Sequence, residues 1–288
     1  MSFHIPCPAE PGMPLAEVDT PALLLDMEAF DSNLDRMDAS LAGRNVRVRP
    51  HAKSHKCPEI ALRQMAHGAV GVCCQKVTEA EAMFAGGIPD VLISNQVVGP
   101  RKIARLIALA QRGRVSVLVD DASNVAALNE AAAQHKVSLN VLVEIDVGAK
   151  RCGVAPGEPA RALAAQVASS GNLHFRGIHA YQGAAQHVRS IEERRSLIAR
   201  AVEMVSDTIA LLRADGLDCE IVTGAGTGTY LMEAASKVYN EIQPGSYVFM
   251  DADYARNLGE DGKPVHTFAH SLFVWTSVLS HAKPGRAI

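Results

Sequence analysis

Short apolar, β-branched runs alternate with longer amphipathic stretches along most of the chain. The longer stretches, such as 58–68 and 100–113, have helical spacing, and several begin with a capping residue or an early proline and end on glycine. Alternating strands and helices with short links favour parallel strands joined by right-handed crossovers. The nine apolar runs are ALLLD (22–26), VRVR (46–49), AVGVC (69–73), VLIS (91–94), VSVLV (115–119), LNVLVEI (139–145), LHFRGIHA (173–180), EIVT (220–223) and YVFM (247–250).

A closed barrel of strand–helix units needs eight of these nine runs. We assign ALLLD outside the barrel, leading into a helix over about 28–41, so that the barrel begins with VRVR and closes with YVFM. A later apolar run at 271–279 predicts a strand of a second, β-rich domain. The predicted organisation is an N-terminal segment and strand (1–27), a (β/α)8 barrel of the TIM type (28–263) and the beginning of a β-rich domain (264–288).

Chemically reactive residues concentrate directly after the predicted strands. In TIM-type barrels the catalytic groups lie on the loops at the C-terminal ends of the strands. We therefore expect an enzyme with one site at the mouth of the barrel. The segments that follow the eight strands are PHAKSHK, CQK, NQ, DDAS, DVGAKRCG, YQG, GAGTGTY and DADY.

Composition narrows the partners of this site. The 288 residues are 48% hydrophobic with a formal net charge of -3, which lacks the basic excess of a nucleic-acid-binding surface. No apolar run approaches the roughly 20 residues that a membrane-spanning helix needs. The start of the chain lacks a signal peptide, and the six scattered cysteines are interpreted as reduced thiols. We expect a cytoplasmic protein that acts on a small molecule.

Lys53 follows the first predicted barrel strand, in RPHAKSHK. Its neighbours Arg49, His51, His55 and Lys56 make a cationic environment. Such an environment lowers the pKa of an amine and favours the neutral form that can make a Schiff base. A solvated basic loop is the alternative interpretation of this motif.

Further candidates follow the second, fifth and sixth predicted barrel strands. Gln75 can hydrogen-bond a cofactor oxygen, and Arg151 is a permanent cation for a phenolate, a phosphate or a carboxylate. His179, Tyr181 and His187 surround YQG, where ring stacking or proton transfer is plausible chemistry. Each of these residue types also occurs in purely structural or surface roles.

The segment TGAGTGTY (223–230) follows the seventh predicted strand and is typical of an anion-binding loop. Its glycines let backbone N–H groups converge on an anion, and Thr227 and Thr229 add hydroxyl donors. Barrel enzymes often bind phosphate in the loops after the seventh and eighth strands. Gly245 and Ser246, placed just before the predicted eighth strand, can add another N–H group and hydroxyl. An ordinary glycine turn is the alternative.

Together, these segments resemble a known enzyme family. RPHAKSHK, VGVCCQKVTEAEA, EIDVGAKRCGV, AYQGAAQH, GAGTGTY and EIQPGSYVFMDADY are similar to motifs of the metal-activated pyridoxal-phosphate enzymes that act on β-hydroxy-D-amino acids. This family includes D-threonine aldolases, 3-hydroxy-D-aspartate aldolases and D-serine dehydratases, and the motifs most resemble the 3-hydroxy-D-aspartate aldolases. The similarity covers about 20–288 and implies the barrel of the alanine racemase N-terminal class.

The resemblance implies roles for particular residues. Lys53 would be the Schiff-base lysine and His187 the general base. Arg151 and Tyr181 would line the cofactor, pyridoxal 5'-phosphate. The other residues implied to contact the cofactor are Gln75, Thr227, Gly228, Gly245 and Ser246.

The resemblance also implies a reaction and a metal. The expected reaction is retro-aldol cleavage of 3-hydroxy-D-aspartate or D-threonine to glycine plus glyoxylate or acetaldehyde, by a homodimer. The alternatives are β-elimination, as in a D-serine or 3-hydroxyaspartate dehydratase, and a catalytically inactive homologue that only binds the cofactor. The family's ligands for a divalent Mg, Mn or Zn ion lie in a later β-domain, so we expect none in this chain and place them beyond Ile288. We therefore expect this chain alone to bind the cofactor but to cleave slowly, so that the assay of its products, and not its rate, identifies the reaction.

Overall fold

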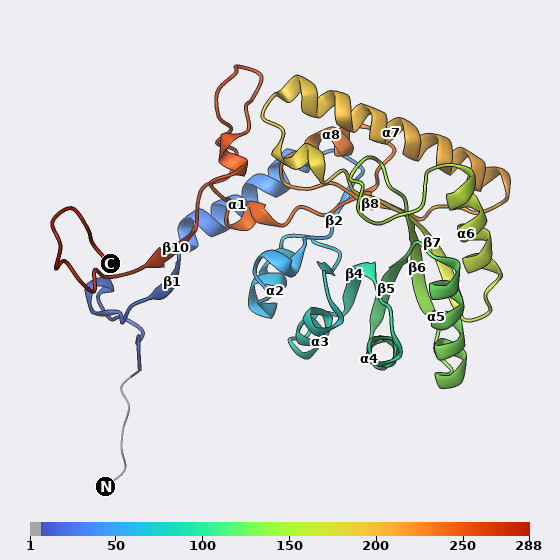
Figure 1. Cartoon of the computed structure of the whole chain (residues 1–288), viewed down its shortest axis with the longest axis horizontal. Coiled ribbons are helices and arrows are strands. Elements are labelled where there is room, and N and C mark those ends of the chain that lie inside the picture. Colours follow the sequence, from blue (N-terminus) through green and yellow to red (C-terminus); the bar gives the residue numbers. More distant parts are fainter. Residues whose placement is uncertain (1–6) are drawn as a thin grey trace, which may run out of the picture.

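A computed structural model describes residues 7–288, and its centre is a sheet of eight parallel strands (Figure 1). The order of neighbours is β2-β9-β8-β7-β6-β5-β4-β3, so most strands pair with the next one along the chain. Helices cover the outside of the curved sheet, as right-handed crossovers between parallel strands require. The strands are β2 (Arg47–Val48), β3 (Val72–Cys74), β4 (Asp90–Gln96), β5 (Arg114–Val119), β6 (Leu139–Glu144), β7 (Leu173–Ala180), β8 (Ile221–Gly224) and β9 (Glu241–Ile242).

The sheet closes into a barrel at a thin seam between β2 and β3. These strands share no continuous ladder, and a single parallel bridge joins His51 to Cys73. Two backbone bonds reinforce it, from Val70 N to the Val48 carbonyl at 2.9 Å and from Cys73 N to the Pro50 carbonyl at 2.8 Å. The predicted alanine-racemase-like (β/α)8 barrel is therefore confirmed.

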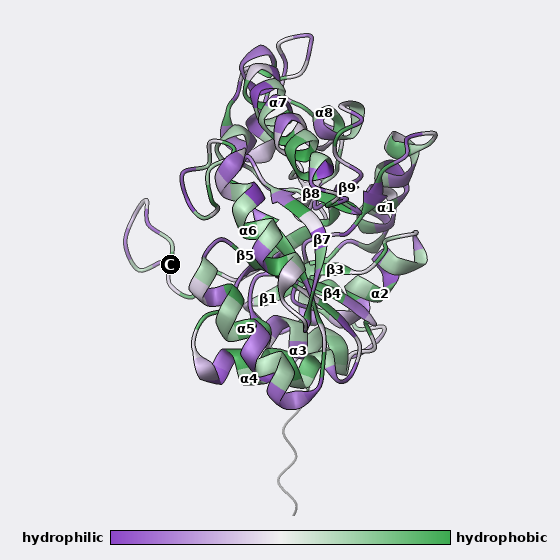
Figure 2. Ribbon diagram, turned by 90° about the vertical axis from the view of Figure 1, so that its right-hand side faces the viewer, coloured by the Kyte–Doolittle hydropathy of each residue, from purple (hydrophilic) through white to green (hydrophobic). Residues whose placement is uncertain are grey.

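The helices begin where the sequence places capping groups. Asp26 accepts from Ala29 N at the start of α1, and Asp121 accepts from Ser123 N and Asn124 N at the start of α5. Proline opens α2, α4 and α6. Both hydrophobic and hydrophilic residues lie on the outer helices (Figure 2), as amphipathic packing on a sheet requires. The helices are α1 (Met27–Leu41), α2 (Pro58–Ala66), α3 (Val77–Ala85), α4 (Pro100–Ala110), α5 (Ala122–His135), α6 (Glu158–Ser169), α7 (Ile191–Ala214) and α8 (Tyr230–Ala235).

The prediction of YVFM as the eighth barrel strand was wrong. The eighth strand is β9 at Glu241–Ile242, and Ser246–Val248 form a 3-10 helix, η4. The run is apolar because it packs against α1 in a second hydrophobic cluster. The Val248 carbonyl accepts from the side chains of Asn33 at 3.2 Å and Ser271 at 2.7 Å, in place of a strand ladder.

This correction changes the position of the second predicted phosphate segment. Because β9 ends at Ile242, Gly245 and Ser246 follow the eighth strand instead of preceding it. Both phosphate segments therefore lie at the C-terminal ends of strands, on the same side of the barrel.

ALLLD lies outside the barrel in a separate sheet. Its strand β1 (Ala22–Leu25) pairs antiparallel with β10 (Leu272–Trp275), so that Leu23 faces Val274. Figure 1 shows this two-stranded sheet beyond α1, away from the barrel. The division into three segments at 27 and 263 stays a prediction. Every helix in the described part of the chain is too short or too polar to span a bilayer.

Candidate active site

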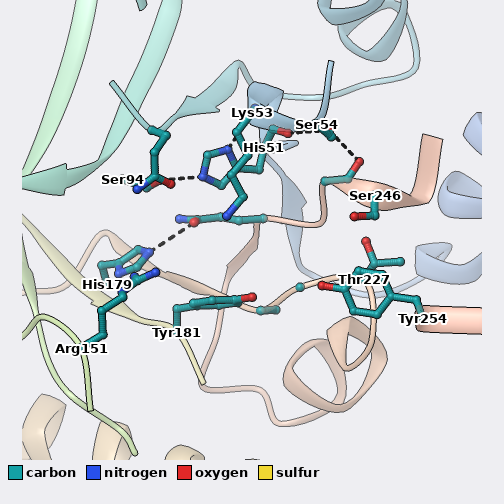
Figure 3. A pocket seen from close by; sticks show the side chains of 15 residues that line it. His51, Lys53, Ser54, Ser94, Arg151, His179, Tyr181, Thr227, Ser246 and Tyr254 are labelled. Atoms are coloured by element: carbon teal, nitrogen blue, oxygen red, sulfur yellow. Dashed lines mark hydrogen bonds between the residues drawn. The ribbon is translucent and has the colours of Figure 1, made fainter. Parts of the chain in front are cut away.

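A pocket opens among the loops that follow the barrel strands (Figure 3). Because the strands are parallel, these loops meet at one end of the barrel, and side chains distant in sequence converge there. Seven of the nine predicted site residues line the pocket: Lys53, Gln75, Arg151, Tyr181, Thr227, Gly245 and Ser246.

Lys53 is held in a short 3-10 turn, η2 (Ala52–Ser54), directly after β2. In Figure 3 its amine points into the pocket between the His51 ring and the loops of the opposite wall. The Lys53 side chain stays accessible in the pocket, and partial desolvation by the surrounding pocket atoms, followed by the positive charge of Arg151, lowers its pKa. Both effects favour a neutral amine, but the charge comes from Arg151 and not from the neighbours within RPHAKSHK to which the sequence analysis attributed it.

Arg151 extends from the loop after β6 toward Tyr181. Its guanidinium carbon lies 5.8 Å from the centre of the Tyr181 ring, within cation–π range. Its Nη2 lies 3.4 Å from Oε1 of Glu144, a buried residue. Burial opposes ionisation of Glu144, but hydrogen bonds from His179 and Gln96 and the charge of Arg151 lower its pKa overall. Glu144 therefore anchors this cationic side of the pocket.

The glycine–threonine loop forms the opposite wall of the pocket. It turns sharply after β8, and Ala225 has φ of +66°, a strained conformation for a residue with a side chain. The buried hydroxyl of Thr227 has no hydrogen-bond partner within residues 7–288. A buried polar group without a partner is costly, so this hydroxyl fits a site for a polar ligand.

Gly245 and Ser246 complete this wall. A Cβ atom at Gly245 would lie 3.1 Å from the His51 carbonyl, so the absence of a side chain keeps the segment close to the Lys53 turn. Ser246 begins η4 and lines the pocket beside Thr227. The residues present therefore fit a small molecule that carries both an aldehyde for Lys53 and a phosphate for the two hydroxyls.

His187 and Gly228 lie outside the pocket lining. His187 ends the 3-10 helix η3 (Ala184–His187), and its Nδ1 lies 2.5 Å from Oδ2 of Asp253. Its ring stacks on Tyr254 at 5.5 Å, and Tyr254 does line the pocket. The Gly228 N–H donates to Oε1 of Gln186 at 3.0 Å, behind the loop. The roles of His187 and Gly228 stay predictions.

The structure adds pocket residues that the sequence did not assign. Tyr254, Ser94 and Gln243 line the pocket together with His51, which the sequence had marked only as a neighbour of Lys53, and His179, which it had named as a candidate beside YQG. Gln243 was missed because the eighth strand was placed too late in the chain. The signal available for Ser94 was its position at the end of the predicted strand VLIS.

One group of potential metal ligands occurs among the described residues: Asp120, Glu144 and Cys152, whose ligand atoms lie within 4.8 Å of one another. Asp120 already accepts from Gly153 N at 2.9 Å. Glu144 accepts from Gln96 and Arg151. A cation would compete with these donors, so the group does not fit a dedicated metal site. The expectation that the family's metal ligands lie beyond Ile288 stays a prediction.

Comparison with known proteins agrees with the fold and the pocket. The chain is 48% identical to a D-threonine aldolase of Arthrobacter sp over 284 residues, which cover 99% of this chain and 74% of the relative. It is 46% identical to a 3-hydroxy-D-aspartate aldolase of Paracoccus denitrificans (strain Pd 1222) over 285 residues, 98% of this chain and 74% of the relative. These similar values do not favour the 3-hydroxy-D-aspartate aldolases that the motifs most resemble.

A solved structure matches the chain along nearly its whole length. The crystal structure of D-threonine aldolase from Filomicrobium marinum superimposes with a TM-score of 0.93 at 53% identity, over 98% of this chain and 76% of that one. A D-threo-3-hydroxyaspartate dehydratase of Delftia sp. (strain HT23) is more distant, at 29% identity over 85% of this chain and 64% of the relative. The model for the alanine racemase N-terminal domain matches residues 25–253. The chain therefore belongs to the alanine racemase N-terminal domain family.

Proposed function

We propose that this chain is a pyridoxal-phosphate-dependent aldolase. It cleaves the Cα–Cβ bond of a β-hydroxy-D-amino acid, 3-hydroxy-D-aspartate or D-threonine. The products are glycine and an aldehyde, glyoxylate or acetaldehyde. The identities to aldolases of this substrate class, 43–48% over nearly the whole chain, support the choice of reaction.

The main support for the proposal is that one pocket has a lysine amine on one wall and two hydroxyl groups on the opposite wall. On one wall Lys53 presents an amine whose pKa is lowered. On the other, Thr227 and Ser246 present hydroxyls, and the buried Thr227 hydroxyl has no partner in the part of the chain that the structure describes. Pyridoxal phosphate, when bound, supplies an aldehyde that condenses with an amine and a ring that accepts electrons from the bond being broken.

The chain's own residues would bind and orient this cofactor. Lys53 would hold it until the amino group of the substrate takes its place. Thr227, Ser246 and the backbone at Gly245 would bind the phosphate. Arg151 would supply a fixed positive charge above Tyr181, whose ring would support the cofactor face.

His187 is the proposed acceptor of the β-hydroxyl proton. When its Nδ1–H donates to Asp253, Nε2 is the ring nitrogen left to accept a proton. Tyr254 stacks on this ring and lines the pocket, so the proposed route for the proton passes along the pocket edge. The same proton can return to Cα after the aldehyde leaves.

A divalent metal near the β-hydroxyl belongs to the same proposal, because a bound cation lowers the pKa of a hydroxyl. We also propose that the enzyme is cytoplasmic and a homodimer.

The test is an assay of the purified protein with pyridoxal phosphate, with and without Mn²⁺ or Zn²⁺. The substrates are D-threonine, 3-hydroxy-D-aspartate and D-serine. Glycine and an aldehyde in equal amounts are expected from one of the first two. Ammonia and a keto acid would instead identify β-elimination, and cofactor binding without either product set would refute turnover by this chain.

A further inference from the structure

His51 lies at the barrel seam, immediately before the turn that carries Lys53. It forms the single bridge between the ends of β2 and β3, with Cys73. Its side chain lines the pocket and is only 7% exposed. The residue therefore contacts both the thin closure of the barrel and the candidate cofactor lysine.

The hydrogen bonds of the His51 ring define which nitrogen carries the proton. The backbone N–H of Lys53 donates to Nδ1 at 3.3 Å, so Nδ1 must be unprotonated. In the neutral ring Nε2 then carries the proton and donates to the Ser94 hydroxyl at 3.0 Å. The Ser94 hydroxyl in turn faces the Cys74 carbonyl at 3.4 Å. Figure 3 shows the contact with Ser94.

The surroundings of His51 keep its ring neutral. Burial comes first, and the nearby basic groups of Lys53, His179 and Arg151 add to it; together they hold the pKa of His51 well below its ordinary value. A protonated ring would lose the acceptor at Nδ1 that the Lys53 turn uses, so the neutral ring is the form that supports the turn.

The Lys53 turn depends on such outside support because it is only three residues long. A 3-10 turn of this length has few hydrogen bonds of its own. The Ser54 hydroxyl lies 3.0 Å from the His51 carbonyl and 3.1 Å from the Gly245 carbonyl, so this side of the turn also rests on residue 51. The direction of the Lys53 amine follows the geometry of this turn.

We propose that His51 is a positioning residue for Lys53. Its neutral, Nε2-protonated ring links the lysine turn to Ser94 across the barrel seam and so holds Lys53 in place. The proposal rests on Lys53 being the cofactor lysine of the proposed function. It assigns His51 no proton transfer, since both ring nitrogens are engaged in holding the turn.

Two substitutions of His51 test the roles of the two ring nitrogens independently. His51→Asn keeps an acceptor near the position of Nδ1 and loses the link to Ser94, whereas His51→Gln keeps a donor near Nε2 and loses the acceptor. Ser94→Ala removes the anchor without touching the turn. Ser271→Ala is the matched control, because it removes a buried hydroxyl bonded to the Val248 carbonyl outside the pocket.

The measurements use pyridoxal phosphate alone, without substrate. They are the rate at which the apo-protein captures the cofactor, the visible circular dichroism of the bound cofactor, and the lysine labelled after borohydride reduction. We expect capture to slow by about two- to tenfold in His51→Gln and Ser94→Ala, the range for one neutral hydrogen bond, with altered dichroism. His51→Asn should resemble Ser94→Ala, because both lose the link to Ser94 and keep the acceptor for the Lys53 turn, and the control should match the wild type.

Each outcome decides between the two proposals. A label on Lys53 together with unchanged capture and dichroism in both His51→Gln and Ser94→Ala would overturn the role of His51 alone. A wild-type label on another lysine would overturn both the His51 proposal and the Lys53 assignment. Where His51→Gln does not fold, Ser94→Ala decides the question. Normal capture without cleavage of any substrate would count only against the proposed reaction.

Discussion

The hydroxyl of Thr227 is a pocket group that has no hydrogen-bond partner among residues 7–288. Thr227→Val removes it and nearly keeps the volume. A hydrogen bond to a charged group contributes roughly 1.5 to 3 kcal/mol, so we expect cofactor affinity to fall about ten- to hundredfold in a titration of apo-protein. Thr78→Val, on the exposed face of α3, is the control. Equal affinity in the two variants would exclude this loop as the phosphate site.

Glu233 is a fully buried carboxyl behind the same loop, and burial raises its pKa to about 7. Because of this raised pKa, the folded protein keeps the Glu233 carboxyl protonated at pH values where the unfolded chain has already lost this proton. The free energy of unfolding should therefore fall between about pH 5 and pH 8, by up to roughly 3 kcal/mol. Glu233→Gln should lose this pH dependence in denaturant titrations at both pH values. The exposed Glu203→Gln should keep it.

At the scale of elements, one buried cation, Arg49, links strands on both sides of the barrel seam. Arg49 bonds Oε1 of Glu241 at 2.9 Å and Oδ1 of Asp90 at 2.7 Å, which ties β2 to β9 and β4. Arg49→Met leaves Glu241, which has no exposed surface, without its closest cation. We expect a loss of about 3 to 5 kcal/mol in the free energy of unfolding. Arg49→Met with Glu241→Gln should recover most of it, and a double variant as unstable as the single one would contradict the charge argument.

The sequence predicted the helices and strands correctly where the buried positions recur with a regular helical or strand spacing. Seven barrel strands coincide with predicted apolar runs because both faces of a barrel strand are buried. β9 was missed because its first residue, Glu241, is charged, and its burial is tolerable because Arg49 and Arg47 pair with it. The glycine–threonine wall of the pocket was predictable from glycines and threonines next to a strand end. Ser94 had only its position at the end of VLIS as a signal, and Gln243 was missed because the eighth strand was placed too late in the chain.

At the scale of the whole molecule, the two-stranded sheet β1–β10 differs from the barrel because apolar side chains on it are exposed. Leu23 and Val274 are cross-strand neighbours on one face of this sheet and are 72% and 67% exposed. No element among residues 7–288 covers this face. An exposed apolar face on a sheet favours association, and we expect a second copy of the chain to cover it in the proposed homodimer.

The substitution pair Leu23→Lys with Val274→Glu tests this expectation. Opposite charges at paired positions keep the strands together while removing the apolar face. Sedimentation velocity over a range of concentrations should show a larger monomer fraction than in the wild type, with the fold intact by circular dichroism. Val98→Lys, at a site 60% exposed after β4, is the control for charge alone. A dimer that persists unchanged in the pair would place the interface elsewhere, on the barrel, and a wild type that is monomeric throughout would remove the homodimer from the proposal.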